Sequence, residues 1–378
     1  MSATPPTTSN SDRPDPLDLL DLIVVGGGPA GAATAIRAAQ IGLNAALFEQ
    51  HKQPPPRPCG GWVSPAGIEL CAACGVGAAD VGAAAFDAIG LHSWDFRKRV
   101  AVKERELHGW IVDRARLDAA LLGAAAAAGA RVVRGVTATG LTLFEDHAVL
   151  SLANGDPVRG RLIVLADGVD SPMARAAGLT PAGRLTASAT SVYAEYSGGT
   201  GEVGLDIVLG VGAGAPLGTI ARDGATTRVS VLLRGPGRGE ELFATMTAGA
   251  EAAGLLPGAP RRIIESTTPG GLALDIESHV GKRCLMVGDA GGFVAAFSNE
   301  GIYPAMKSGW LAAETARDAA HAPLPQDVLA EFGARWRGVL ADYLRMPNTD
   351  LSLLLPLIFS NAQMSKRVAQ AFLLGRKF

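Results

Sequence analysis

Apolar and polar positions divide this chain into regions of two different patterns. Residues 19–25 (LLDLIVV) form a nearly continuous apolar run, which is typical of a strand buried on both faces of a parallel sheet. The Ala-rich segment 29–42 predicts a helix that ends at Gly42, and residues 44–49 (NAALFE) predict a second short strand. The first region therefore begins with a strand–helix–strand unit of the α/β class.

The second pattern extends from about residue 187 to residue 275. Period-two alternation in SVYAEYSG, LDIVLGVG and TTRVSVLLRG predicts strands, and ARDGATT predicts a hairpin turn. Residues 240–255 predict a helix that packs on these strands. We expect an antiparallel sheet that binds the substrate, followed by a C-terminal part made of helices.

The length of the chain, 378 residues, exceeds what one ordinary core holds, so we expect two interleaved domains or one large α/β unit. The predicted fold is α/β: a Rossmann-like nucleotide-binding domain interleaved with an antiparallel β-sheet substrate domain, plus C-terminal helices. The predicted parts are a disordered tail (1–17), the nucleotide-binding domain (18–85, 108–185 and 276–325), the substrate domain (86–107 and 186–275) and the helical segment (326–378).

Composition and charge narrow the functional class. The formal net charge of −2 provides no basic field, which argues against nucleic-acid binding. Four cysteines do not make a disulfide framework, so a reducing, cytoplasmic setting is expected. The apolar stretch 351–359 is interrupted by Pro356 and is far shorter than the ~20 residues of a membrane-spanning helix. We therefore expect a soluble protein with at most a peripheral membrane contact through its C-terminal helices.

The first motif predicts a dinucleotide site. Gly26, Gly28 and Gly31 fit the pattern G-x-G-x-x-G between the predicted strand and helix, and Glu49 ends the next strand. The glycines permit a tight turn and close approach of the backbone to a pyrophosphate, and the helix N-terminus offers free N–H groups. Glu49 can accept hydrogen bonds from ribose hydroxyls. This unit alone does not separate FAD from NAD.

Two later stretches favour FAD. Residues 161–175 predict a buried strand that ends at Ala166-Asp167-Gly168, and residues 282–289 predict another that ends at Asp289. A carboxylate at such a strand end can bind a ribityl hydroxyl. A helix that starts near Gly301 and Ile302 would direct its positive end at the flavin pyrimidine edge and stabilise the charge of reduced flavin.

These segments resemble the large FAD-dependent group that includes aromatic hydroxylases, flavin halogenases and geranylgeranyl reductases. The resemblance covers nearly the whole chain after the tail and rests on GGGPAG with Glu49, VDRARLD (112–118), LADG (165–168) and GDAGG…EGI (288–302). It implies a p-hydroxybenzoate hydroxylase-like fold and FAD as cofactor, and it implies that Arg114 contacts FAD. The alternative for Arg114 is a surface residue beside a helix cap at Asp113.

One segment resembles the geranylgeranyl reductase branch in particular. RPCGGWVSPAGIELC, from residue 57, is similar to the R-x-x-C-G-G-x-x-S-P segment of that branch. The His and Pro-Pro that hydroxylases carry after GDA are missing, and so is the W-x-W-x-I-P stretch of halogenases. The resemblance implies that Cys59 lies near the flavin and takes part in saturating carbon–carbon double bonds of prenyl chains.

Elementary chemistry agrees with a role for Cys59. An unactivated alkene is a poor hydride acceptor, so a proton donor must act together with the flavin. An ordinary thiol is mostly protonated at neutral pH and can supply that proton. The alternative is that Cys59 is a small apolar residue in a loop that faces the flavin. Arg57 is either a phosphate ligand or a surface residue.

The candidate residues can be stated together. Cys59 is the candidate catalytic residue, and no metal site is predicted, because C-x-x-C at residues 71–74 is a single pair that we expect to be packed in a helix. The candidate cofactor-binding residues are Gly26, Gly28, Pro29, Ala30, Gly31, Glu49, Gln50, Arg57, Cys59, Gly60, Arg114, Val136, Ala166, Asp167, Gly168, Asp289, Gly301 and Ile302.

Two features depart from the prenyl-reductase branch. Its aromatic Y-x-W-x-F-P-like strand corresponds to GAPLGTIARDG (214–224), which has no aromatic residue, and its Pro-Leu-Thr-Gly corresponds to residues 296–299 (AFSN). Both departures lie on the substrate side.

We therefore expect an FAD-dependent reductase, or in reverse a dehydrogenase, that acts on a double bond of a small apolar, isoprenoid-like or lipid substrate. The alternatives are an NAD(P)H-dependent flavin monooxygenase and a non-catalytic or electron-transfer flavoprotein. No second dinucleotide motif names the electron donor, so either NAD(P)H or a ferredoxin-like protein could serve.

Overall fold

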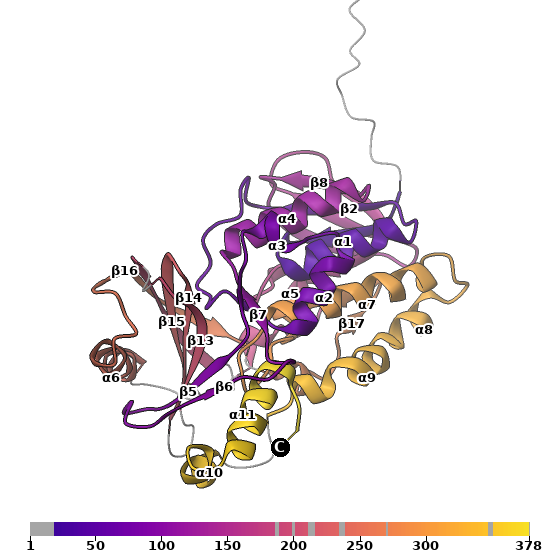
Figure 1. The fold of residues 1–378 in the computed structure, drawn as a ribbon. Coiled ribbons are helices and arrows are strands. Elements are labelled where there is room, and N and C mark those ends of the chain that lie inside the picture. Colours follow the sequence, from indigo (N-terminus) through magenta and orange to yellow (C-terminus); the bar gives the residue numbers. More distant parts are fainter. Residues whose placement is uncertain are drawn as a thin grey trace, which may run out of the picture.

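The computed structural model describes residues 19–185, 189–198, 201–210, 216–233, 239–269, 271–346 and 351–377. The predicted disordered tail, 1–17, lies outside these residues, as do residues 214 and 215 of the segment that departs from the prenyl-reductase pattern. Figure 1 shows the two large sheets and the helices that cover them. No helix of the described ranges combines the length and the apolar character needed to cross a membrane.

The first sheet is built around the apolar run at the start of the chain. β1 lies at its centre and pairs in parallel with β2 and β11, while β8 and β18 extend the parallel part outward. Leu22 and Val24 pack against the helices on one face, and Ile23 and Val25 pack on the other, so β1 is buried on both sides as predicted. The strands of this sheet are β1 (Leu20–Val25), β2 (Ala45–Glu49), β8 (Arg131–Arg134), β9 (Ala138–Leu143), β10 (Ala148–Leu152), β11 (Val158–Leu165), β17 (Val280–Gly281) and β18 (Cys284–Met286).

Helix α1 directly follows β1 and packs against α4 and α7 on one face of the sheet. The predicted cap is confirmed at α4, where the Asp113 side chain accepts a hydrogen bond from the Arg116 N–H at 3.0 Å. On the other face, β9, β10 and α5 cover the sheet. The helices and short 3₁₀ turns here are α1 (Pro29–Gln40), α2 (Pro65–Ala73), α3 (Ala78–Val81), α4 (Arg114–Ala127), α5 (Pro172–Ala176), η1 (Ala182–Arg184), η2 (Leu272–Leu274), η3 (Gly288–Gly291) and α7 (Ile302–Ala320).

The second sheet has seven strands in the order β16-β12-β15-β14-β13-β5-β6. The predicted hairpin turn joins β14 to β15. The sheet is antiparallel as predicted, except that β13 and β5 run parallel across a long chain connection. Helix α6 (Gly239–Ala252) covers one face of this sheet. The strands are β5 (Ile89–Ser93), β6 (Arg99–Val102), β12 (Ala189–Ser197), β13 (Val203–Leu209), β14 (Leu217–Asp223), β15 (Thr226–Leu233) and β16 (Pro260–Thr268).

A small sheet and the C-terminal helices join the two large sheets. β3 (Trp62–Val63) and β4 (Ala84–Phe86) pair with β7 (Gly109–Ile111), and the helices that follow α7 are α8 (Pro325–Ala330), α9 (Phe332–Leu344), α10 (Leu351–Ile358) and α11 (Ala362–Leu374). Phe372 of α11 packs against Trp62 with ring centroids 5.0 Å apart. The last helices therefore cover the place where the two sheets meet.

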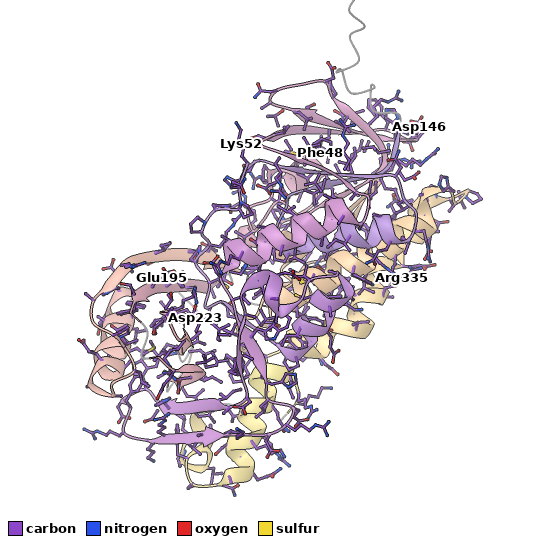
Figure 2. The ribbon with its side chains drawn as sticks, turned by 45° about the horizontal axis from the view of Figure 1, so that its top comes forward. Phe48, Lys52, Asp146, Glu195, Asp223 and Arg335 are labelled. Atoms are coloured by element: carbon purple, nitrogen blue, oxygen red, sulfur yellow. The ribbon has the colours of Figure 1, made fainter. Side chains whose placement is uncertain are left out.

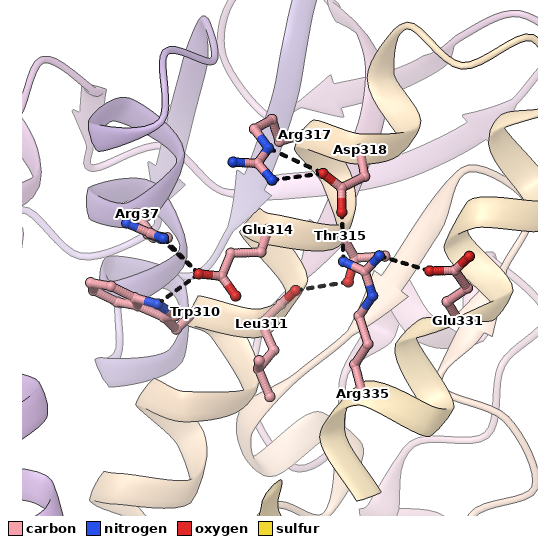
Figure 3. A network of polar contacts seen from close by, with 9 residues as sticks. All are labelled: Arg37, Trp310, Leu311, Glu314, Thr315, Arg317, Asp318, Glu331 and Arg335. Carbon is pink, nitrogen blue, oxygen red and sulfur yellow. Dashed lines mark hydrogen bonds and ion pairs between the residues drawn. The ribbon is translucent and has the colours of Figure 1, made fainter. Parts of the chain in front are cut away.

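Polar contacts fix α7 between α1 and α9 (Figure 3). Glu314 accepts hydrogen bonds from Arg37 of α1 at 2.7 Å and from Trp310 of its own helix at 3.2 Å. Arg335 of α9 contacts Asp318 at 2.7 Å. These contacts join α7 to α1 on one side and to α9 on the other.

Candidate flavin and substrate site

The glycine-rich turn between β1 and α1 is held in a conformation that side chains would prevent. Gly26 has φ of +100°, and a Cβ on Gly26 would fall on the Ala166 carbonyl oxygen. A Cβ on Gly31 would fall on the Gly26 carbonyl oxygen. A Cβ on Gly28, in contrast, would meet nothing within 4 Å, so open space lies in front of the helix N-terminus.

Helix α1 begins in the way the sequence predicts. Pro29 occupies its first position, Gly28 caps it without a side-chain hydrogen bond, and Ala30 is buried beneath. The first N–H groups of the helix therefore have no side-chain cap and face that open space. This turn fits a diphosphate, because it combines unpaired N–H donors, the positive helix end and room for the ligand.

Glu49 supports the turn directly. Its Oε2 accepts a hydrogen bond from the Gly27 N–H at 2.6 Å, and its Oε1 accepts one from the His51 N–H at 2.8 Å. A carboxylate accepts about four hydrogen bonds, so Glu49 keeps acceptor capacity for ribose hydroxyls. The neighbouring Gln50 is exposed, and the Val136 N–H donates to the Glu49 carbonyl at 3.0 Å. The structure thus brings all three predicted residues to one end of β2.

The segment after β11 carries Asp167, which the sequence assigns to the cofactor. The Asp167 carboxylate accepts hydrogen bonds from the Ser171 hydroxyl and from the Met173 N–H at 3.1 Å, so it is bonded within its own loop. The Ala166 N–H donates to the Val25 carbonyl at 2.8 Å, and Ala166 lies under the glycine turn. Gly168 adopts φ of +91° in this loop. The segment shapes the floor of the site.

A charged cluster joins α4 to η3. Arg114 Nη2 lies 3.2 Å from Asp118 Oδ1, and the charges of Asp118, Cys59 and Asp289 raise the pKa of Arg114 against the opposing effect of burial. Burial raises the pKa of the Asp289 carboxyl, although Arg114 and Arg57 act in the opposite direction. Asp289 is nevertheless open to solvent, so its carboxylate is accessible to a ligand. Arg57 is also exposed, and it lies close enough to influence Asp118 and Asp289.

The start of α7 lies beside this cluster. A Cβ on Gly301 would lie 3.8 Å from Asp289 Oδ1, and Ile302, the first helical residue, is buried. The two positions that the sequence assigns to the flavin side, Asp289 and Gly301, are therefore neighbours. Gly301 caps α7 without a side-chain hydrogen bond, so the N–H groups of this helix also begin without a side-chain cap.

Sequence reasoning missed the buried Glu300, which precedes Gly301. Its carboxylate accepts hydrogen bonds from the Tyr343 hydroxyl, from the Tyr303 N–H at 2.9 Å and from the Ser64 hydroxyl at 3.3 Å. Burial raises the pKa of Glu300 from 4.5 to about 7. Glu300 therefore ties the Cys59 loop, through Ser64, to α7 and α9. The feature of the sequence that could have identified Glu300 is that it is the acidic residue of the EGI motif.

The Cys59 loop lies between the two sheets. Cys59 is half-buried, and its Sγ accepts a hydrogen bond from the Gly61 N–H at 3.4 Å. The thiol lies close enough to both Arg114 and Tyr193 to influence the pKa of each. Gly60 is buried, and a Cβ there would lie 3.4 Å from Thr219 Oγ1 of β14. Cys59 is thus placed where the Arg114–Asp289 cluster meets the second sheet.

The face of the second sheet that meets this loop is polar, which sequence reasoning did not anticipate. The Tyr193 hydroxyl donates to Glu195 Oε2 at 3.2 Å, and Arg228 Nη1 lies 2.8 Å from Asp223 Oδ2. Figure 2 shows Glu195 and Asp223 on this sheet. The feature of the sequence that could have predicted this polar face is the alternation of Tyr193 and Glu195 with the apolar residues of β12.

The other cysteines are packed in the core. Cys71 and Cys74 are buried in the cluster beneath α1 and α7, and Cys284 is buried in β18. Burial raises the pKa of each of these thiols to about 12, so they are unreactive at neutral pH. None of the four cysteines forms a disulfide, and the part of the chain that the structure describes contains no cluster suited to a metal ion.

Comparison with known proteins agrees with this geometry. Residues 20–196 match the family model described as "FAD binding domain". Digeranylgeranylglycerophospholipid reductase 2 of Methanosphaera stadtmanae is 27% identical over 318 residues, which is 79% of this chain and 78% of the relative. The chain is a distant homologue of these reductases. Menaquinone reductase of Mycobacterium tuberculosis is 31% identical over 43% of this chain and 40% of its own length.

Solved structures confirm the fold class. A geranylgeranyl bacteriochlorophyll reductase-like protein of Thermoplasma acidophilum has a TM-score of 0.75 at 19% identity, covering 94% of this chain and 96% of its own. The flavin-dependent halogenase CmlS has a TM-score of 0.70 at 16% identity, covering 95% and 73%. The fold is therefore an α/β FAD-binding fold with two large sheets, like that of these two solved structures.

Proposed function

We propose that this protein is an FAD-dependent oxidoreductase that reduces carbon–carbon double bonds of an apolar, isoprenoid-like or lipid substrate, or introduces them in the reverse direction. The observation that carries the proposal is the position of Cys59, between the Arg114–Asp289 cluster and the substrate sheet. The homologous digeranylgeranylglycerophospholipid reductases support the same reaction class.

The residues present fit FAD. The glycine turn and the N-terminus of α1 would hold the diphosphate, and Glu49 would hold a ribose. Asp289 would bind a ribityl hydroxyl, with Arg114 on the other side of the same cluster and the N-terminus of α7 near the pyrimidine edge. When bound, reduced FAD supplies the hydride for the reaction.

Cys59 would supply the proton. Its thiol is half-buried, and the loop backbone beside it lies against Thr219 and Arg228 of the second sheet. Arg114 would stabilise the thiolate left after proton transfer, because its guanidinium lies close to the sulfur and stays protonated. The Cys59 thiolate would then take up a proton from solvent, which restores the thiol.

The electron donor and the setting are part of the proposal. NAD(P)H or a ferredoxin-like protein would reduce the flavin in a cytoplasmic protein. Contact with a membrane surface would involve α10, where Leu357 is 47% exposed.

Anaerobic flavin reoxidation tests the proposed function. The purified protein is reduced without oxygen and mixed with geranylgeraniol or with methyl geranylgeranoate, while flavin absorbance and product mass are followed. A gain of two hydrogens in the product supports the reductase. Reoxidation that requires oxygen and adds an oxygen atom would show a monooxygenase, and a flavin that no prenyl substrate reoxidises would contradict the proposal.

A further inference from the structure

Beside Cys59, the substrate sheet presents polar side chains in place of the apolar wall that a hydrocarbon substrate requires. We propose that the substrate carries a carbonyl conjugated with the reacting double bond, and that Tyr193 and Arg228 bind this carbonyl. The inference deepens the proposed function and rests on it for the reaction. The carbonyl-binding site rests on the polar side chains of the second sheet.

The wall is formed by residues of β12, β14 and β15 that share one face. Tyr193 pairs across the strands with Ser230, and Glu195 pairs with Arg228. Thr219 of β14 joins them through a 2.7 Å contact with Ser230. The members of this polar wall are Tyr193, Glu195, Thr219, Asp223, Arg228 and Ser230.

The wall directly faces the Cys59 loop. A Cβ on Gly61 would lie 3.4 Å from Arg228 Cδ, and a Cβ on Gly60 would lie 3.4 Å from Thr219 Oγ1. Gly61 has φ of +73°, which brings the loop backbone against the sheet. Tyr193 lies near the Cys59 thiol itself. A double bond placed at Cys59 would therefore be within reach of Tyr193 and Arg228.

The apolar part of the same face is filled by the protein's own side chains. Leu205, Ile207 and Leu217 belong to a cluster with Phe372 of α11, and all four side chains are buried. Glu195 and Ser230, in contrast, remain partly accessible. The accessible part of the face nearest Cys59 is thus polar.

Covering these groups with hydrocarbon alone would cost free energy. Burial of a polar or charged group without a compensating hydrogen bond is unfavourable by about 1–3 kcal/mol for a neutral group and by more for an ion. A carbonyl oxygen reduces this cost, because it accepts hydrogen bonds from the Arg228 guanidinium and from the Tyr193 hydroxyl, which would turn from Glu195 Oε2 to the ligand. Arg228 has five N–H donors, and its contact with Asp223 uses Nη1.

The same contacts serve the reaction. The carbon β to the carbonyl receives a hydride from the reduced flavin, and the α carbon receives the proton of Cys59. Two C–H bonds form, the π bond breaks, the flavin is left oxidised and the thiolate takes a proton from solvent. Negative charge that develops on the carbonyl oxygen is stabilised by the Arg228 guanidinium.

Binding to the oxidised FAD-loaded protein tests the inference separately from turnover. The probes are methyl geranate, a conjugated ester, and 2,6-dimethyl-2,6-octadiene, a hydrocarbon with a methyl group in place of the ester. Isothermal titration calorimetry gives both dissociation constants. We expect the ester to bind at least tenfold more tightly, and we expect Tyr193→Phe and Arg228→Gln each to reduce this preference at least fivefold.

Tyr196→Phe is the matched control, because Tyr196 lies on the same strand but packs on the opposite face with α6 residues. We expect it to leave the preference unchanged. If Arg228→Gln fails to fold after losing its contact with Asp223, Tyr193→Phe and Thr219→Val carry the test. Equal binding of the two probes, or a preference that Tyr193→Phe does not alter, would overturn the inference.

Turnover distinguishes failure of the inference from failure of the proposed function. Conversion of methyl geranate to methyl citronellate by the reduced protein supports both. Tight, Tyr193-dependent binding of the ester without any reduction supports the carbonyl site and contradicts the reductase. Equal reduction of both probes supports the reductase and overturns the carbonyl site.

Discussion

Two clusters of carboxylates and arginines, one open to solvent and one closed, show how similar side chains can have different roles. In the first, Arg114 lies 3.2 Å from Asp118, and Asp289 stands nearby, open to solvent. In the second, on the α6 side of the substrate sheet, Asp206 lies 2.8 Å from His92 and 2.7 Å from Arg222. Both clusters concentrate charge inside the protein.

The pKa directions separate the two clusters. Burial raises the pKa of Asp289, so the charge there is not fully compensated by protein groups. The hydrogen bond from His92 and the charge of Arg222 outweigh burial at Asp206, and its pKa is lowered. The side chains of the second cluster are at most 5% exposed. The closed cluster pairs its charges with one another, although Arg222 Nε and Nη1 have no hydrogen-bond partner, whereas the open cluster leaves Asp289 accessible to a ligand.

The largest expected effect is at the closed cluster. We expect Asp206→Asn to lower the free energy of unfolding by about 3–5 kcal/mol, because it leaves Arg222 buried without its counter-charge. Denaturant titration of the FAD-loaded protein measures the loss. The flavin content of the folded protein should stay unchanged, and a loss of flavin without a loss of stability would show that this cluster belongs to the site.

Glu300 provides a test of pH dependence. Its folded-state pKa is raised to about 7, so the folded protein holds more protons than the unfolded chain between pH 4.5 and 7. This contribution makes stability fall as pH rises through that window. We expect Glu300→Gln to flatten this fall, as measured by denaturant titrations at pH 5, 6 and 7. An unchanged slope would show that Glu300 is already ionised in the folded protein.

The open cluster should behave in the opposite way to the closed one. We expect Asp289→Asn to weaken FAD binding at least tenfold, while the free energy of unfolding of the flavin-free protein stays the same or rises, because an uncompensated charge is removed. Flavin fluorescence titration and denaturant titration measure the two quantities. Unchanged FAD affinity would remove Asp289 from the cofactor site.

The smallest effect is expected at the surface of α7. Arg37 and Glu314 are 27% and 28% exposed, so Arg37→Ala should cost less than about 1 kcal/mol of stability and leave FAD binding unchanged. Denaturant titration again measures the change. A loss above 2 kcal/mol would show that this contact holds α7 against α1 more strongly than a surface ion pair can.

The sequence predicted the parts of the site that depend on local chain geometry. The glycine turn, the helix start at Pro29 and the cap at Asp113 are encoded by neighbouring residues, and the structure confirms them. Parallel pairing of β5 with β13 could not be predicted, because it joins segments more than a hundred residues apart.

The polar wall and Glu300 depend on tertiary pairing. Arg228 faces Glu195 only after β12 and β15 align, and Tyr343 reaches Glu300 only when α9 packs beside α7. The sequence pattern predicts the strand or helix in which each of these residues lies, but it does not predict which residues contact one another. The local bond between Asp167 and Ser171 was also not predicted, and the Asp167 carboxylate keeps acceptor capacity for a cofactor hydroxyl.

The most direct test of the central claim compares Cys59→Ser with the unaltered protein. Both are reduced without oxygen, and flavin reoxidation is followed with methyl geranylgeranoate and, as a control, with ferricyanide, which needs no proton donor. We predict that Cys59→Ser binds FAD normally, reacts normally with ferricyanide and is reoxidised by the alkene at least tenfold more slowly. An unchanged rate with the alkene would show that the Cys59 thiol only packs against the flavin site and would contradict the account.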